Sequence, residues 1–220
     1  MSFWSNLSVK WKQIVLYLLV GILPLGVVTY INNVSFKEIQ NINASNLQTG
    51  ASEIADKVDR NLFERYGDVQ AFALNTILRN KDLWYKPGSP IVDSMNSYVD
   101  TYDIYYLTIL VDLEGKVIAV NEKDDSGNPI STGHIYSQNY KNADWFQNVV
   151  NKKFYISQQG NTGDSGFTGT AITPLHIDEE VKRVYSGDNG MSIGFAAPVY
   201  DADGNVFAVW NNYAKFSLVE

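Results

Sequence analysis

Residues 14–31 read Ile14-Val-Leu-Tyr-Leu-Leu-Val-Gly-Ile-Leu-Pro-Leu-Gly-Val-Val-Thr-Tyr-Ile31, a run that contains no charged side chain. As an α-helix with a rise of about 1.5 Å per residue, this run is roughly 27 Å long, close to the hydrocarbon thickness of a bilayer. Lys10 and Lys12 precede it, whereas the next basic residue is Lys37. Because positive residues favour the cytoplasmic side, we expect a cytoplasmic tail at 1–13 and a transmembrane helix at 14–31. Residues 32–220 are then extracytoplasmic or periplasmic, on an inner (plasma) membrane.

Two other interpretations of this run are a cleaved signal peptide and a buried soluble helix. A signal peptide has a shorter apolar region that ends in a small-x-small cleavage site, whereas this run continues into Thr29-Tyr-Ile-Asn-Asn33. Pro24, with Gly21 and Gly26 beside it, disfavours a soluble core helix but is tolerated within a membrane. The transmembrane helix is therefore the prediction.

The composition excludes several classes of function. The chain has 17 Lys and Arg against 24 Asp and Glu, a net charge of −7, so it lacks the excess of cations that nucleic-acid binding needs. It has no cysteine, which removes disulfides, thiolate nucleophiles and cysteine metal sites. We therefore expect no nucleic acid among its partners.

Residues 32–86 are predicted to form one long extracytoplasmic helix. Up to about residue 80 they contain no proline, and apolar residues recur at spacings of three, four and seven, as at Ile39, Ile42, Ile54 and Val58. A single apolar stripe of this length needs a partner. That partner is either the domain that follows or a second copy of the helix, so we expect a homodimer through this helix.

Residues 87–220 are predicted to form one domain of the α+β class. Two β-hairpins are indicated by β-branched and aromatic runs around Asp-x-x-Gly turns, at 104–120 and at 195–210. Between them we expect a short helix within 136–150, capped at Asn142 or Asp144, and a helix at 177–185. We also expect a short strand at 153–156 and a Gly-rich loop at 158–169. A further helix is expected at 91–102. The hairpins would share one antiparallel sheet flanked by these helices.

The order of these parts resembles the Cache domain, the PAS-like extracytoplasmic sensor of bacterial methyl-accepting chemotaxis proteins. The likeness rests on the Asp112-x-x-Gly115 hairpin, the Trp145-Phe146 helix, the Tyr155-Ile-Ser157 strand and Ala197-Pro-Val-Tyr-Asp-x-Asp-Gly204. It implies the N-terminal, ligand-sensing part of a chemotaxis receptor that transduces a signal across the membrane. Membrane histidine kinases and diguanylate cyclases also use such sensors, and either output remains an alternative.

The resemblance also implies a ligand site, but two of its charged anchors are missing. Where the family binds amino acids, an Arg stands two positions before the helix Trp, and an Asp lies in the last strand. Here these places hold Ala143 and Trp210-Asn-Asn-Tyr213. A neutral, planar or cationic small solute, or a solute-binding protein, is therefore expected in place of an α-amino acid. With Asn211 beside them, the candidate ligand-binding residues are Tyr105, Tyr136, Trp145, Phe146, Tyr155, Trp210 and Asn212.

Catalytic and metal sites are not expected. Neither His134 nor His176 has an acid at metal-ligand spacing, and the chain lacks a P-loop, a dinucleotide fingerprint and a nucleophile elbow. Asp201-x-Asp203-x-Asn205 resembles the start of a calcium loop, but its Gly is misplaced and a hairpin turn explains it better. We expect a non-enzymatic sensor without a cofactor. The rival of another class is a membrane-anchored adhesion or assembly protein, which would expose its aromatic residues as a patch.

Overall fold

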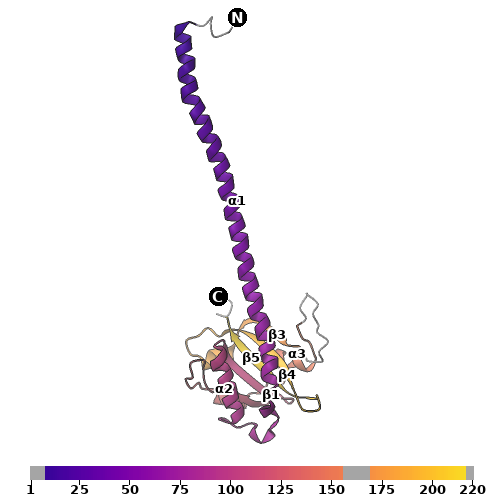
Figure 1. Cartoon of the computed structure of the whole chain (residues 1–220). Helices are drawn as coiled ribbons and strands as arrows, with labels where there is room; N and C mark the ends of the chain where they lie inside the picture. The colour runs from indigo at the N-terminus through magenta and orange to yellow at the C-terminus, as the bar shows by residue number, and fades with distance from the viewer. Residues whose placement is uncertain (1–7, 156–168, 217–220) are drawn as a thin grey trace. The chain divides into compact units, whose positions relative to one another are not determined.

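The computed structural model describes residues 8–155 and 169–216 (Figure 1). The expected loop at 158–169 therefore lies, apart from Gly169, outside the described residues. The chain consists of two compact units, residues 1–56 and 57–220. The elements are, in order, α1 (Val9–Ala73), η2 (Thr76–Arg79), η3 (Lys81–Leu83), α2 (Pro90–Tyr102), β1 (Tyr105–Asp112), β2 (Val117–Val120), η4 (Gly133–Ser137), α3 (Asp144–Val150), β3 (Ala171–Ile177), α4 (Glu179–Val184), β4 (Met191–Tyr200) and β5 (Val206–Lys215).

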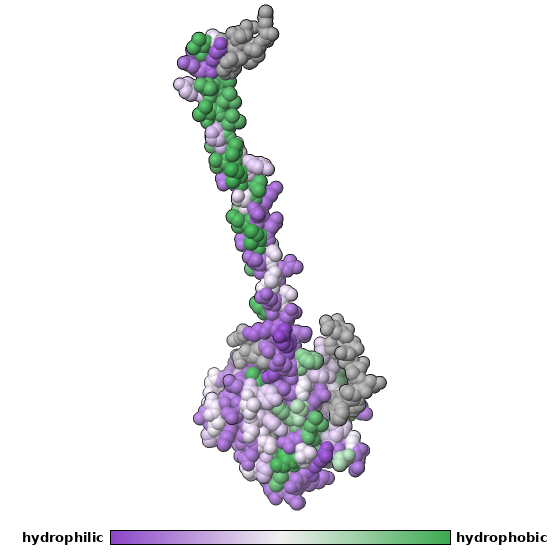
Figure 2. Space-filling model, viewed as in Figure 1, coloured by the Kyte–Doolittle hydropathy of each residue, from purple (hydrophilic) through white to green (hydrophobic). Residues whose placement is uncertain are grey.

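The described part of the first unit is helical and belongs to α1, which continues into the second unit as far as Ala73. It includes the uncharged run at 14–31 and continues through Pro24 without a break. By length and composition, α1 is apolar enough to cross a membrane, and its most apolar window has no buried residue. Figure 2 shows these hydrophobic side chains gathered near the N-terminal end of the helix.

The C-terminal end of α1 lies well before residue 86. Asn75 accepts a hydrogen bond at its side-chain oxygen from the backbone N–H of Ile77, and Asn80 does the same for Asp82, each at 3.1 Å. These side chains cap two short 3₁₀ turns, η2 and η3. Because Asn competes with the helix for backbone hydrogen bonds, α1 ends at Ala73 and the chain turns toward α2.

The domain is built on a five-stranded sheet of order β2-β1-β5-β4-β3, in which all neighbouring strands are antiparallel. The predicted α+β class and both predicted hairpins, β1–β2 and β4–β5, are confirmed. The predicted strand at 153–156 does not form in its described part: the N–H of Tyr155 bonds to Thr170, but no ladder follows. One edge of the sheet is formed by β3, which pairs with β4 and where no strand was predicted.

The short helix predicted within 136–150 is α3, whose N-cap is Ala143 in place of the predicted Asn142 or Asp144. η4 ends at Ser137 and α3 begins at Asp144. Between them the side-chain amide of Asn139 donates to the carbonyl of Glu114, and the N–H of Tyr140 donates to the carbonyl of Gly115. These bonds hold the segment against the β1–β2 turn, so the helix cannot run through it. The helix predicted at 177–185 is α4, whose N-cap is Asp178.

Three turns share one construction. In each, an aspartate Oδ1 accepts hydrogen bonds from the backbone N–H groups two and four residues later, and a glycine three residues later has a positive φ. The aspartates are Asp112, Asp124 and Asp201. This bonding accounts for the Asp-x-x-Gly pattern, and it confirms that the calcium-like stretch at Asp201 is a hairpin turn.

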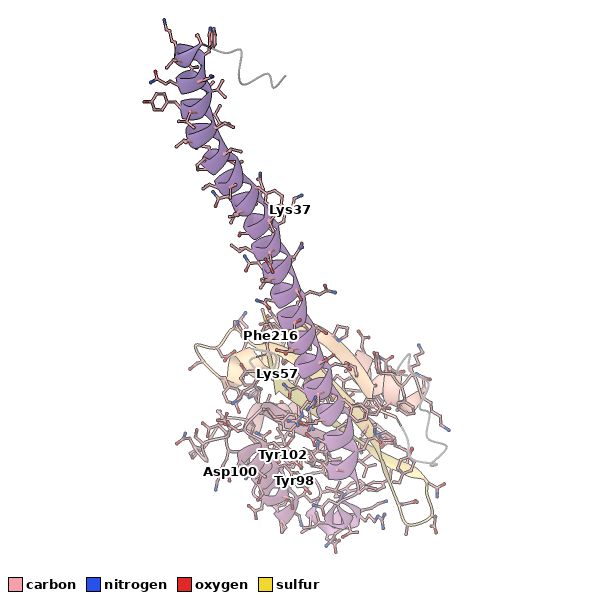
Figure 3. The ribbon with its side chains drawn as sticks, turned by 45° about the horizontal axis from the view of Figure 1, so that its top comes forward. Lys37, Lys57, Tyr98, Asp100, Tyr102 and Phe216 are labelled. Carbon is pink, nitrogen blue, oxygen red and sulfur yellow. The ribbon has the colours of Figure 1, made fainter. Side chains whose placement is uncertain are left out.

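The sheet is buried on both faces. One face, which we call the α2 face, packs against α2 and the end of α1. Phe72 of α1 stacks on Tyr98 of α2 at 4.1 Å between ring centroids and meets Tyr102 edge-on. Figure 3 labels Tyr98 and Tyr102. The other face, the α3 face, packs against η4, α3 and α4. Because side chains alternate along a strand, neighbouring residues of β5 belong to different faces.

Candidate functional site

The α3 face contains a buried amide without a partner. Asn211 lies in the middle of β5, paired in register with Ile109 of β1 and Ala196 of β4, and is 0% exposed. Val209 and Tyr213, two residues away on either side, belong to the α3-face core, so Asn211 points to the same face. Neither Nδ2 nor Oδ1 has a hydrogen-bond partner among the described residues. Each unmet buried group costs about 1–3 kcal/mol, so a polar partner for this amide would be stabilising.

A glycine lies beside this amide. Gly194 of β4 pairs with Tyr213, next to Asn211. A Cβ atom on Gly194 would stand 3.7 Å from Asn211 Oδ1 and only 3.0 Å from the Cβ of Thr173. A side chain at this position would therefore crowd Thr173 of β3 beside the amide.

A second buried polar atom without a partner lies on the same face. The hydroxyl of Tyr140 has no hydrogen-bond partner among the described residues, and its ring lies 5.5 Å from that of Trp145. Burial raises the pKa of Tyr140, and the charges of Glu180 and Asp178 raise it further. Tyr140 is therefore a neutral hydroxyl in a site bounded by carboxylates.

Tyr213 joins this group from β5. Burial raises its pKa well above the ordinary value, and the negative charge of Asp178 adds to the effect, while a hydrogen bond with Trp145 opposes it. Tyr213 lies two residues from Asn211 on the same face, about 6.6 Å along the strand. We call Tyr140, Trp145, Asn211 and Tyr213 together the α3-face site.

Two carboxylates at the start of α4 border the α3-face site. Asp178 caps the helix through Oδ1, which accepts from the N–H groups of Glu180 and Val181. Its Oδ2 lies 3.5 Å from Nε2 of His176, and Oε2 of Glu180 lies 2.7 Å from Nε2 of His134. Both histidines of the chain are thus paired with these two acids.

The sequence-predicted ligand residues are divided between the two faces. Trp145 and Phe146 belong to the α3-face core, with Tyr136 packed against it; burial raises the pKa of Tyr136 to about 12. Tyr105 and Trp210 belong to the α2-face core, and the indole N–H of Trp210 donates to Asn212 at 2.6 Å. The side chain of Tyr155 is 56% exposed.

One pocket lined by Trp145, Tyr155 and Trp210 is therefore not formed. The reason is that side chains alternate between the two faces along β5. Ala208 and Trp210 lie on the α2 face, whereas Val209 and Asn211 lie on the α3 face. The sequence interpretation missed Tyr140, Tyr213, Asp178 and Glu180. The same alternation from Val209 would have selected Asn211 and Tyr213, but nothing local to the sequence predicts that Tyr140 and α4 reach this face.

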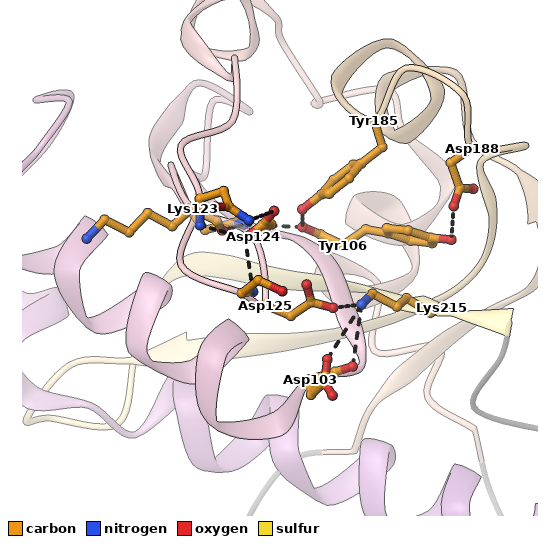
Figure 4. Close-up of polar contacts among 11 residues, drawn as sticks. Asp103, Tyr106, Lys123, Asp124, Asp125, Tyr185, Asp188 and Lys215 are labelled. Atoms are coloured by element: carbon orange, nitrogen blue, oxygen red, sulfur yellow. Dashed lines mark hydrogen bonds and ion pairs between the residues drawn. The ribbon is translucent and has the colours of Figure 1, made fainter.

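Another polar cluster surrounds Lys215 at the end of β5 (Figure 4). Its ammonium forms ion pairs with Asp125 and Asp103 and lies 5.8 Å from the ring centre of Tyr106. Burial lowers the pKa of Lys215, and the negative charge of Asp103 opposes that shift. The hydroxyl of Tyr106 in turn donates to Asp188 at 2.8 Å. The cluster thus connects the last strand to the turn at 124–128 and to the segment that follows α4.

A polar cavity of about 250 Å³ lies elsewhere, between α2 and the 124–128 turn. Its lining residues are Asp93, Asn96, Ser97 and Asp100 of α2, together with Lys123 and Gly127. The Oδ1 of Asn96 already accepts hydrogen bonds from the N–H groups of Glu122 and Lys123. The internal bonding of its wall makes this cavity a weaker candidate than the α3-face site.

Comparisons with known proteins give distant likenesses only. No family model and no curated protein matches the chain. Among solved structures, it is similar to an extracellular ligand binding receptor from Desulfohalobium retbaense DSM5692, at 12% identity and a TM-score of 0.42, over 76% of this chain and 23% of that one. It is also similar to the sensor domain of the V. cholerae histidine kinase DctB, at 12% identity and a TM-score of 0.44, over 80% of this chain and 57% of that one. The chain thus spans less than two thirds of either protein, and likenesses at these TM-scores establish neither fold nor function.

Proposed function

We propose that this chain is the sensing segment of a membrane receptor, in which the α3-face site binds a small solute. The observation that carries the proposal is the buried Asn211 amide, which lacks a hydrogen-bond partner at both ends among the described residues. The unpaired hydroxyl of Tyr140 and the nearby ring of Trp145 supply a second polar contact and an apolar wall. Sites for small ligands have this composition, largely apolar with a few convergent polar groups.

The membrane part of the proposal rests on α1. A helix apolar enough to cross a bilayer, preceded by Lys10 and Lys12, supports an N-terminus in the cytoplasm and a domain outside. Apolar side chains such as Ile39, Ile42, Leu47 and Ile54 are exposed on α1 beyond the uncharged run. A second copy of the helix would cover them, so a homodimer through α1 is part of the proposal, and cysteine cross-linking at Ile42 and Leu47 tests it.

The Cache resemblance favours a methyl-accepting chemotaxis receptor as the output of this sensor. A histidine kinase or a diguanylate cyclase is the alternative output. The adhesion rival is disfavoured, because Trp145 and Trp210 are 6% and 0% exposed and therefore form no surface patch. Hybrid receptors that join residues 1–220 to the cytoplasmic part of a chemoreceptor or of a histidine kinase would show which output responds to a solute.

Binding to the α3-face site is tested with the full chain in lipid nanodiscs. A panel of amines, sugars, purines and carboxylates is screened by thermal shift, since a one-site ligand at a hundred times its Kd stabilises the protein by about 2.7 kcal/mol. We expect Asn211→Leu to abolish the response to whichever compound binds. Thr108→Val is the matched control, because Thr108 is also fully buried with an unpaired hydroxyl but lies on the α2 face, beside Leu110. Equal responses of both variants would contradict the assignment.

A further inference from the structure

Two acids lie close to the α3-face site, and each is paired with a histidine. Asp178 lies 3.5 Å from His176, whose ring is 6.4 Å from that of Tyr213, and Glu180 lies 2.7 Å from His134. The ionisable groups that raise the pKa of Tyr140 and Tyr213 include Asp178 and Glu180 in both cases, and no basic side chain contributes. The side chains of these two acids are only 14% and 24% exposed. Water therefore screens their field less than it screens the field of a surface carboxylate.

The two acids are held in place by bonds within the domain. Asp178 is fixed as the N-cap of α4, and Glu180 is fixed by His134 at 2.7 Å. The neighbouring basic residues of α4, Lys182 and Arg183, are exposed, and Lys182 pairs with Glu179 at 3.5 Å. A ligand in the site would thus meet two fixed acids and no fixed lysine or arginine among the described residues of α4.

The rings of the site add to this preference. Tyr140 and Trp145 lie at a centroid distance of 5.5 Å with their planes tilted by 40°, and Phe146 meets Trp145 edge-on at 6.1 Å. The faces of aromatic rings attract cations, most strongly when water is excluded. An anion would meet both the ring faces and the acids unfavourably, and at Ala143 it would find no arginine to offset them.

The unpaired polar atoms refine the class of ligand. The hydroxyl of Tyr140 and Asn211 Oδ1 can accept hydrogen bonds, which an ammonium or a hydroxyl can donate. Asn211 Nδ2 donates, and so needs an oxygen acceptor on the ligand. From these contacts we infer that the α3-face site, in its proposed role as a solute sensor, takes a small organic cation that also carries a hydroxyl or carbonyl oxygen. Amino alcohols and their quaternary ammonium analogues belong to this class.

The test compares cationic ligands with a neutral and an anionic one. Choline and ethanolamine are titrated by calorimetry into the full chain in nanodiscs of zwitterionic lipid, at fixed ionic strength. Their comparators are 3,3-dimethylbutan-1-ol, the neutral analogue of choline with the same shape, and propionate. We expect the cations to bind about tenfold or more tightly than the neutral alcohol, and propionate not to bind, since a cation is attracted both to the aromatic faces and to the acids.

A pair of variants separates site charge from overall charge. Glu180→Gln keeps an oxygen acceptor for His134 and removes one charge, whereas Glu179→Gln removes the same charge from the adjacent residue, whose side chain is 80% exposed. We expect Glu180→Gln to weaken choline binding about tenfold and Glu179→Gln to leave it within about twofold.

Three results would overturn the inference: equal affinity for choline and the neutral alcohol, tighter binding of propionate, or no binding of either cation. None of these contradicts solute binding itself, because the broader screen with Asn211→Leu tests that proposal without reference to ligand charge. Equal effects of the two Gln variants would likewise place the cation outside the α3-face site.

Discussion

The backbone N–H of Tyr140 donates a hydrogen bond to the carbonyl of Gly115 over 2.8 Å. This bond attaches a residue of the proposed binding site to the turn between β1 and β2. Gly115 has φ +80°, and a Cβ atom there would stand 2.2 Å from the backbone N of Lys141. The turn and the segment that carries Tyr140 therefore approach each other at a distance that only glycine permits.

Gly115→Ala should consequently lower the free energy of unfolding by more than about 2 kcal/mol and weaken ligand binding, because it forces Tyr140 away from the turn. Gly127→Ala is the matched control, since Gly127 has φ +77° in the same kind of turn but nothing within 4 Å of its added Cβ. It should cost only the backbone strain, about 1–2 kcal/mol, and leave binding intact. Chemical denaturation of both variants checks this, and equal losses would show that the close approach does not matter.

Asn211→Leu should stabilise the ligand-free protein. The substitution removes two buried polar groups that have no partner within residues 8–155 and 169–216. It replaces them by an apolar side chain of similar size, which relieves about 1–3 kcal/mol of desolvation cost. The measurement is the melting temperature of the full chain without ligand. Destabilisation by the same amount would instead mean that a buried water satisfies the amide.

Alkaline unfolding should begin near pH 10. Burial is the first cause of a raised pKa for seven tyrosines, namely Tyr85, Tyr105, Tyr106, Tyr136, Tyr140, Tyr185 and Tyr213. A group whose pKa is higher in the folded state stabilises the fold fully below its unfolded pKa of about 10 and loses that contribution as pH rises. For Tyr136 the loss extends to about pH 12.

Tyrosinate absorbance and circular dichroism, followed together during an alkaline titration, test this expectation. Because these tyrosines are protected by the fold, the two signals should change at the same pH, in one cooperative step. Tyr140→Phe removes one of the protected groups and should move that step to higher pH. Ionisation of the buried tyrosines before any loss of secondary structure would contradict the expectation.

Local sequence patterns predicted the elements whose cause is local. The Asp112-x-x-Gly115 and Asp201-x-x-Gly204 turns are made by an aspartate and a glycine within five residues, and both hairpins form where these patterns indicate. The end of α1 was predicted too late, because helical periodicity continues past Ala73 while the capping by Asn75 is decided by one side chain. β3 was missed because Ala171–Ile177 has a mixed burial pattern and depends on pairing with β4.

The site was predicted less well than the fold, for reasons of long-range packing. Trp145 and Trp210 suggested one pocket because both are large aromatics. Side chains alternate between the faces along β5, however, so Trp210 lies on the α2 face and Trp145 packs on the α3 face. Tyr140 enters the site through contacts with Gly115, and Glu180 borders it through His134, a residue 46 positions away. Such pairings depend on the assembled sheet, so residue type and spacing alone do not reveal them.

Lys215 and Asp125 should be energetically coupled. The two side chains are 19% and 17% exposed, so their ion pair is partly withdrawn from water. Lys215→Met should lower the free energy of unfolding by about 1–3 kcal/mol, chiefly because Asp125 is left without its cation. Adding Asp125→Asn should recover part of that loss, and the double-mutant cycle should give a coupling of about 1–2 kcal/mol.

The exposed pair Lys182 and Glu179, with side chains 47% and 80% exposed, provides the control for this cycle. Its coupling should stay below about 0.5 kcal/mol, because solvent and salt screen the attraction. Equal couplings in the two cycles would show that Lys215 is no more than a surface ion pair. A strong coupling at Lys215 would instead establish that the end of β5 is held to the 124–128 turn, so that a displacement of that turn is felt by the last strand.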